Sequence, residues 1–108
     1  MGYIRHNVIV CTFWDMKRAE LCHSKAKEIF GKYVTEITPE STNGYCAFMI
    51  PPDGSKEGWA ESVDGDCRRE RFRKWLDENY SENYCKWFEA VMPEDDKTYI
   101  LGEQNDTE

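Results

Sequence analysis

The apolar run Val8-Ile9-Val10-Cys11 limits the possible folds more than any other stretch of the chain. Four consecutive apolar residues, three of them β-branched, are typical of a strand inside a sheet that is covered on both faces. We therefore predict a central strand over residues 3–13. The polar residues that precede the run, Arg5, His6 and Asn7, would then lie at the end of a central strand, near a sheet edge where binding sites often form.

The next segment predicts a helix that begins at Asp15 and ends before Gly31. An aspartate is a good N-cap because its carboxylate accepts hydrogen bonds from the first turn and suits the positive helix start. Glycine is a natural C-terminal stop. Between the two, apolar residues at helical spacing form one stripe that we expect to face the core: Ala19, Cys22, Ala26, Ile29 and Phe30.

Two antiparallel strands joined by a turn are predicted next. Residues 34–38 form the first of them, and Pro39 ends it or confines it to a sheet edge. Asn43-Gly44 is the strongest short signal for a hairpin turn. Residues 45–50 form the second.

A second helix and two strands complete the order of elements. Asp64-Gly65-Asp66 offers a turn and an N-cap, so we expect a helix over residues 67–79. Residues 84–92 predict a strand, and residues 98–101 predict a short extra strand that follows a turn. Five large side chains are placed by this assignment: Phe72, Trp75 and Leu76 point inward, and Trp87 lies on the face opposite Phe88.

Strand, helix, strand, strand, helix, strand is the order of the split βαβ arrangement. We therefore predict an α+β fold, a ferredoxin-like βαββαβ sandwich. It would have an antiparallel sheet with two helices on one face and an extra C-terminal hairpin strand. A chain of 108 residues suits one domain. We assign residues 1–101 to that domain and residues 102–108 to a disordered acidic tail.

Composition excludes several classes of function. A net charge of -7 repels nucleic-acid backbones and anionic lipid, so no nonspecific nucleic-acid binding is expected. Five cysteines without a Cys-x-x-Cys pair indicate reduced, buried thiols of a cytosolic protein. Two histidines without a carboxylate at ligand spacing argue against a metal centre, and we expect no cofactor. No signal peptide opens the chain, and no apolar stretch approaches the ~20 residues that span a bilayer.

Residues 51–59 carry many of the functional groups that a polar binding site uses. The backbone around Asp53 and Ser55 could form an anion-binding nest to which Lys56 adds a positive charge. Trp59 could stack on a base or a ring. The alternative is a proline-opened turn in which Trp59 fills the core. The glycine and lysine order of a P-loop is absent.

Other candidate ligand-binding residues lie outside this loop. His6 could act as an acid or base or donate to a phosphate, or it could be a half-buried imidazole bonded to backbone. The arginine-rich run over residues 68–74 is typical of a solvated helix face, although Arg69 could reach an anion held by the loop. Arg5 could neutralise phosphate, Trp14 could stack on a base, and Asn43 could bond to ribose or base edges.

Several strings in the chain together resemble a family of small proteins encoded by tailed bacteriophages. The similarity runs over residues 3–92, and its most specific string is Pro-Asp-Gly-Ser-Lys-Glu-Gly-Trp at residues 52–59. The looser strings are Tyr3-x-Arg5-His6-Asn7-x-Ile9-Val10, Trp14-Asp15, Asn43-Gly44-Tyr45, Gly65-Asp66 with Arg69, and Phe72-x-x-Trp75-Leu76. The resemblance implies a phage protein that acts in the host bacterial cytoplasm, and it brings no activity with it. Small phage proteins of this kind often counter host defence, sometimes by sequestering nucleotide signals.

The leading hypothesis is a phage counter-defence protein that binds and sequesters a small nucleotide-derived host immune signal without catalysis. One alternative is an enzyme that cleaves such a nucleotide, with His6 as acid or base and Lys56 or Arg69 stabilising charge. Another is an inhibitor that binds a host defence protein. The many aromatic residues also permit a homodimer that buries the open face of the sheet.

Overall fold

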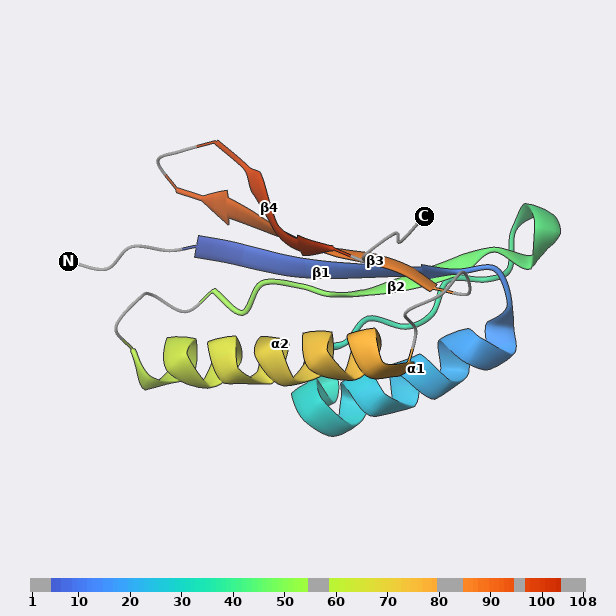
Figure 1. The fold of residues 1–108 in the computed structure, drawn as a ribbon, viewed down its shortest axis with the longest axis horizontal. Helices are drawn as coiled ribbons and strands as arrows, with labels where there is room; N and C mark the ends of the chain where they lie inside the picture. Colours follow the sequence, from blue (N-terminus) through green and yellow to red (C-terminus); the bar gives the residue numbers. More distant parts are fainter. Residues whose placement is uncertain (1–4, 55–58, 80–84, 95–96, 104–108) are drawn as a thin grey trace.

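The computed structural model describes residues 5–54, 59–79, 85–94 and 97–103, which form two layers (Figure 1). One layer is a sheet of four strands and the other consists of two helices that lie against one face of it. The elements in chain order are β1 (Arg5–Phe13), α1 (Met16–Phe30), the 3-10 turns η1 (Gly31–Tyr33) and η2 (Thr42–Gly44), β2 (Cys46–Ile50), α2 (Ala60–Asn79), β3 (Cys85–Pro93) and β4 (Tyr99–Glu103). The fold is therefore α+β.

The sheet has the strand order β2-β1-β3-β4, and each neighbouring pair is antiparallel. β1 is central, as its apolar run predicts. Its alternate residues Ile9, Cys11 and Phe13 are buried toward the helices, whereas Val8 and Val10 are only half-buried on the other face. The prediction that both faces of this strand are covered is therefore wrong for the described residues, because both helices lie on one side of the sheet.

Helix α1 follows its sequence signals closely. The Asp15 Oδ1 atom accepts a hydrogen bond of 2.7 Å from the backbone N–H of Arg18, and Gly31 ends the helix with a φ of 64°. All five residues of the predicted stripe are buried. Four of the five cysteines, including Cys22 of this helix, are buried as free thiols, and Cys67 is exposed.

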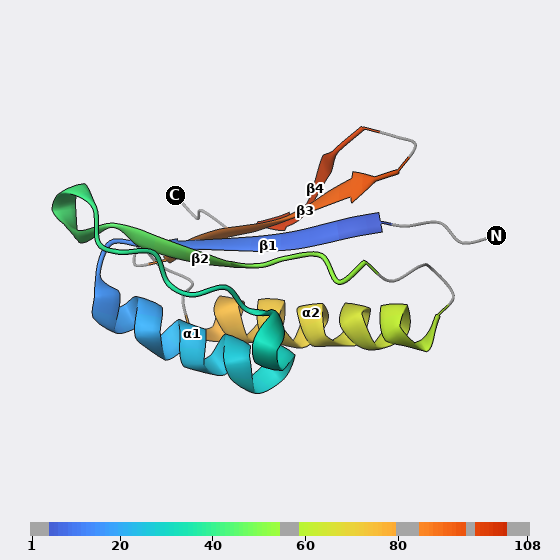
Figure 2. The same ribbon diagram turned by 180° about the vertical axis from the view of Figure 1, so that it is seen from behind.

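Residues 34–41 do not form the predicted strand, although they run along the outer edge of β2 (Figure 2). The Thr35 N–H donates to the Met49 carbonyl at 3.1 Å, but the Met49 N–H donates to the Thr35 hydroxyl at 2.9 Å. Thr38 and Ala47 repeat this exchange, with the Thr38 hydroxyl accepting at 3.0 Å. The Thr35 carbonyl lies 2.9 Å from His23 Nε2, so it turns toward α1 and its hydroxyl takes its place in the sheet.

Helix α2 begins at Ala60, seven residues earlier than the first residue of the predicted helix. Asp64-Gly65-Asp66 is thus helix interior, and the predicted turn there is wrong. The first half of the helix buries Ser62, Gly65 and Arg69, which are small or polar, so no apolar stripe marks it in the sequence. The second half buries Phe72 and Leu76, as predicted.

Strands β3 and β4 complete the described sheet. Trp87 is buried and Phe88 is partly exposed, as their predicted opposite faces require. β4 pairs with β3, with a register shift at Glu89/Ala90, and includes Gly102 and Glu103, which the sequence had assigned to the tail. Residues 104–108 lie outside the described residues. Neither described helix is long and apolar enough to cross a membrane.

Candidate functional site

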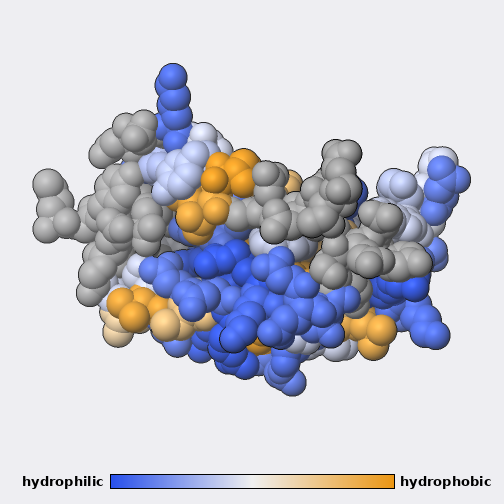
Figure 3. Space-filling view, in the orientation of Figure 1, coloured by the Kyte–Doolittle hydropathy of each residue, from blue (hydrophilic) through white to orange (hydrophobic). Residues whose placement is uncertain are grey.

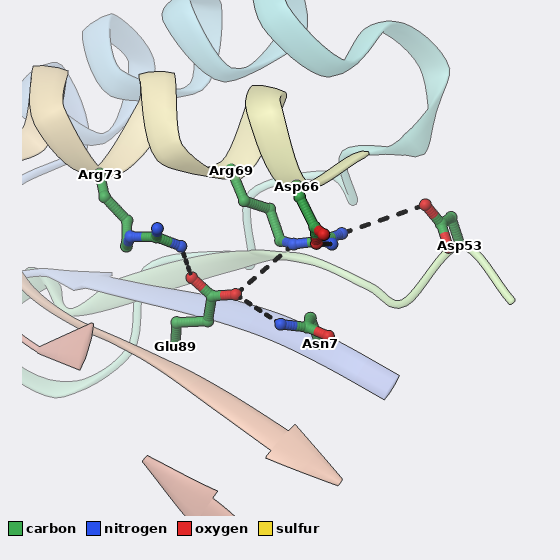
Figure 4. Close-up of polar contacts among 6 residues, drawn as sticks. All are labelled: Asn7, Asp53, Asp66, Arg69, Arg73 and Glu89. Carbon is green, nitrogen blue, oxygen red and sulfur yellow. Dashed lines mark hydrogen bonds and ion pairs between the residues drawn. The ribbon is translucent and has the colours of Figure 1, made fainter. Parts of the chain in front are cut away.

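A fully buried carboxylate lies under the first half of α2. Glu89 of β3 is 0% exposed and points toward the helix layer (Figure 4). Its Oε2 atom accepts a hydrogen bond of 2.8 Å from Asn7 Nδ2 and lies 3.5 Å from Arg69 Nε. Its Oε1 atom pairs with the Arg73 guanidinium. Because a buried charge is tolerated only when it is paired and hydrogen-bonded, these three partners explain how Glu89 is accommodated in the interior.

The Arg69 guanidinium connects the buried Glu89 carboxylate to carboxylates near the surface. Its side chain is 9% exposed, and its NH2 atom lies 2.5 Å from Asp66 Oδ1. Its NH1 atom lies 4.0 Å from Asp53 Oδ2, on the segment that follows β2. One arginine therefore links a buried carboxylate to two partly exposed ones (Figure 4).

Gly65 allows the segment after β2 to lie directly against α2. A Cβ atom at this position would lie 2.7 Å from Asp53 Oδ2 and 3.2 Å from Arg69 NH1, which is too close. A glycine inside a helix destabilises it by about 1 kcal/mol relative to alanine. The close approach of the Asp53 carboxylate and the Arg69 guanidinium is the feature of the site that requires it.

A pocket of about 320 Å³ opens beside this contact. Trp59 and Tyr33 line it with half of each side chain exposed, at 49% and 51%. The Arg68 guanidinium on its wall pairs with Asp64 at 2.9 Å. The pocket thus combines aromatic, acidic and cationic groups, and its lining is Phe30, Tyr33, Ile50, Pro51, Asp53, Gly54, Trp59, Glu61, Asp64, Gly65, Arg68 and Arg69.

Three of the predicted ligand-binding residues meet at this pocket: Asp53, Trp59 and Arg69. The interpretation of Trp59 as a core side chain is wrong, because the indole is half exposed. The solvated helix face expected for residues 68–74 does not include Arg69, which is buried. Ser55, Lys56 and the side chain of Arg5 lie outside the described residues.

The other three predicted residues lie elsewhere. His6 is next to Asn7 on β1, so its side chain is directed to the opposite face of the sheet, away from the pocket. Trp14 and Asn43 lie at the far end of the sheet, where Phe13 pairs with Cys46, whereas the pocket lies beyond Ile50. There the Trp14 ring packs against Tyr45 with centroids 6.1 Å apart.

Sequence reasoning missed Glu89, Asn7 and Tyr33. A signal for Glu89 was present, because it shares the buried face of β3 with Cys85, Trp87 and Val91. A carboxylate in the middle of an inward-facing apolar series requires a partner. The partners could not be identified in advance, since Asn7 is 82 residues away.

The described lining of the pocket carries groups that can exchange protons as well as bind a ligand. It includes three carboxylates and the Tyr33 hydroxyl, but no histidine, cysteine, serine or threonine. The described residues also contain no group of three or more histidine, cysteine or acidic side chains that could hold a metal ion.

Comparison of the chain with protein-family models, curated proteins and solved structures found no match.

Proposed function

We propose that this protein is a non-catalytic binder that captures a small nucleotide-derived ligand in the pocket between α2 and the segment after β2. The observation that carries the proposal is the pair of half-exposed rings, Trp59 and Tyr33, over a pocket whose wall holds hydrogen-bonding charged groups. Stacking of a base on an aromatic side chain stabilises a complex by about 1–3 kcal/mol.

The biological role in this proposal is counter-defence. The string Pro-Asp-Gly-Ser-Lys-Glu-Gly-Trp at residues 52–59 resembles that of the phage family, and its described residues Asp53, Gly54 and Trp59 line the pocket. In the host bacterial cytoplasm, the protein sequesters a nucleotide-derived immune signal before its receptor binds it. The fold in this proposal is a ferredoxin-like βαββαβ sandwich with an extra C-terminal hairpin strand, in which residues 34–41 take the place of the second strand. Their hydrogen bonds to β2 support this assignment.

Ligand recovery and a pair of tryptophan variants test the proposal. The protein is incubated with a panel of cyclic and ADP-ribose-type nucleotides, washed and heated, and the released compound is identified by mass spectrometry. We expect one compound to return intact. Trp59→Ala should weaken its binding about 5- to 150-fold, which is the stacking energy expressed as a ratio of dissociation constants. Trp14→Ala, at the far end of the sheet, is the matched control and should leave binding unchanged.

Two outcomes would contradict the proposal in different ways. Recovery of a cleaved product under multiple turnover would favour the enzyme hypothesis over capture. Failure of every compound to bind, with the protein folded, would remove the ligand function altogether.

The open face of the sheet favours a second candidate, a protein interface. Val10, Phe88 and Ile100 line a shallow hollow on this face, and Ile100 is 52% exposed. Figure 3 shows a hydrophobic patch over β4 beside the hydrophilic surface of α2. We propose that a second copy of the chain covers this face. The described residues that line the hollow include no carboxylate, so two copies would bring no pair of acidic side chains together there.

Sedimentation of wild type and Phe88→Glu at micromolar concentration tests the homodimer. We expect a dimer that the added carboxylate converts to a monomer. A monomeric wild type that instead captures one host defence protein in stoichiometric amount would favour the inhibitor hypothesis over the homodimer.

A further inference from the structure

The charges of the described residues around the pocket, which do not include residues 55–58, are not those of a phosphate site. Its lining holds three carboxylates, on Asp53, Glu61 and Asp64, against two guanidinium groups. Both arginines already bind carboxylates of the protein, since Arg68 pairs with Asp64 at 2.9 Å and Arg69 lies between Asp66 and Glu89. A phosphate that entered would meet a net negative wall and would have to displace a carboxylate from its arginine.

The same wall suits a neutral group that donates hydrogen bonds. A carboxylate accepts at two oxygens, so it can bind the two neighbouring hydroxyls of a ribose or the amino group of a base. The Asp53 carboxylate, with 32% of its side chain exposed, is held at the wall by its contact with Gly65 and the Arg69 guanidinium. The half-exposed rings of Trp59 and Tyr33 offer flat apolar surfaces beside it.

The volume of the pocket also favours a small ligand group. Ligand pockets of drug-sized molecules range over about 300–1,000 Å³. A pocket of about 320 Å³ lies at the small end of this range and suits one base with its sugar better than a whole dinucleotide.

We propose that the pocket takes the nucleoside end of its ligand, with the base on the aromatic rings and the ribose hydroxyls on Asp53, and that the phosphates remain outside in solvent. This inference rests on the proposed function and adds to it the part of the ligand that is recognised. It reverses the usual expectation for a nucleotide binder, in which arginines and backbone amides hold the phosphates and supply most of the affinity.

A matched ligand series tests the inference with the wild-type protein. Tryptophan fluorescence or calorimetry measures the dissociation constants of adenosine, guanosine, cytidine and uridine, and of their 5′-mono-, 5′-di- and 5′-triphosphates. For the base that binds, we expect the nucleoside to bind within about threefold of the monophosphate or more tightly, and each further phosphate to weaken binding. A nucleoside that binds more than about tenfold more weakly than its monophosphate would overturn the inference.

Removal of the hydroxyl donors from the ligand, or of the carboxylate acceptor from the protein, locates the contact. The 2′,3′-dideoxynucleoside and the Asp53→Asn variant should each lose about tenfold in affinity, whereas Asp77→Asn, at an exposed position of α2 outside the pocket, should leave nucleoside affinity unchanged. The dideoxy ligand needs no altered protein, so the result stands even if Asp53→Asn folds poorly. Full affinity for the dideoxy ligand would overturn the assignment of the ribose to Asp53.

The outcome also separates this inference from the function on which it rests. Nucleotides that bind while their nucleosides do not would leave the proposed function in place and overturn this inference. If no member of the series binds, this inference falls, whereas the proposed function falls only if the panel of cyclic and ADP-ribose-type nucleotides also fails to bind.

Discussion

Helices α1 and α2 lie on the same face of the sheet and bury different chemistry. The buried positions of α1 are all apolar: Ala19, Cys22, Ala26, Ile29 and Phe30. In α2 only the second half follows this rule, with Phe72 and Leu76. Its first half buries a serine, a glycine and an arginine, and the arginine meets a carboxylate that is 0% exposed.

The two helices differ in how they are held against the sheet: α1 by a stripe of apolar side chains, and the first half of α2 by particular polar contacts. A helix stabilised by an apolar stripe can exchange one aliphatic side chain for another of similar volume at small cost. The first half of α2 has no such freedom, because Gly65 and Arg69 are fixed by particular atoms of Asp53, Asp66 and Glu89. Local rules of sequence tend to fail at functional sites, and here they fail where the pocket opens.

Removing the Glu89 carboxylate should produce the largest loss of stability and tests the difference between α1 and α2 most directly. In Glu89→Ala, the Arg69 and Arg73 guanidinium groups lose their buried partner, and Asn7 loses its acceptor. Truncation of one member of a buried ion pair usually destabilises a protein by about 3–5 kcal/mol. Urea unfolding followed by circular dichroism should show a loss of this size.

Glu20→Ala, an exposed position on α1, is the control and should change the free energy of unfolding by less than about 0.5 kcal/mol. A loss below about 1 kcal/mol in Glu89→Ala would mean that both arginines reach water once the carboxylate is gone. The first half of α2 would then be an ordinary solvated surface.

The contrast between the helices also explains how much of the structure could be predicted. The order of the main elements, the stripe of α1 and the stop at Gly31 follow from apolar spacing and backbone preference, which are local. The start of α2 was missed because Gly65 and its neighbours look like a turn unless the approach of Asp53 is known. The prediction of a strand over residues 34–38 was wrong because His23, from another element, binds the Thr35 carbonyl.

The candidate site could be predicted only in part. Asp53 and Trp59 were found because one loop carries them, and Arg69 because it lies in the helix that follows this loop. Glu89 and Asn7 were not, since their contact depends on the pairing of β1 with β3 across most of the chain. His6 was placed with the site because it lies at the end of a central strand, but the alternation of the strand sends its side chain to the face opposite Asn7.

Alkaline pH should lower the stability of the protein through the buried Cys11 thiol, which is hydrogen-bonded to Cys22 of α1. Burial, and hydrogen bonds with the Cys22 and Cys85 thiols, raise the pKa of Cys11 well above its ordinary value of 9.0. Below about pH 8, both the folded and unfolded states keep this proton, and stability does not depend on it. Above pH 9 the unfolded chain loses the proton first and thus binds fewer protons. Stability should then fall by about 1.4 kcal/mol per pH unit for this thiol.

Unfolding free energies measured between pH 7 and pH 10.5 test this expectation. Cys11→Ala should be less stable than the wild type at every pH. Above pH 9, its free energy of unfolding should fall less steeply with pH, by the slope that corresponds to about one proton. Equal slopes in the two proteins would mean that the Cys11 thiol ionises as easily in the folded state as in the unfolded chain.

A double-mutant cycle on Gly65 and Asp53 should give the smallest effect and the sharpest test of the comparison. Replacing a glycine inside a helix by alanine normally stabilises it by about 1 kcal/mol. In Gly65→Ala the new Cβ atom would lie 2.7 Å from Asp53 Oδ2, so the carboxylate must move and the gain should be lost. In the Asp53→Ala background that obstacle is absent, and much of the gain should return. The coupling free energy between the two positions, measured by thermal or urea unfolding, should therefore be about 1 kcal/mol. If Gly65→Ala has the same effect in both backgrounds, the contact between Asp53 and α2 does not explain the glycine. The first half of α2 would then differ from α1 only in its arginine.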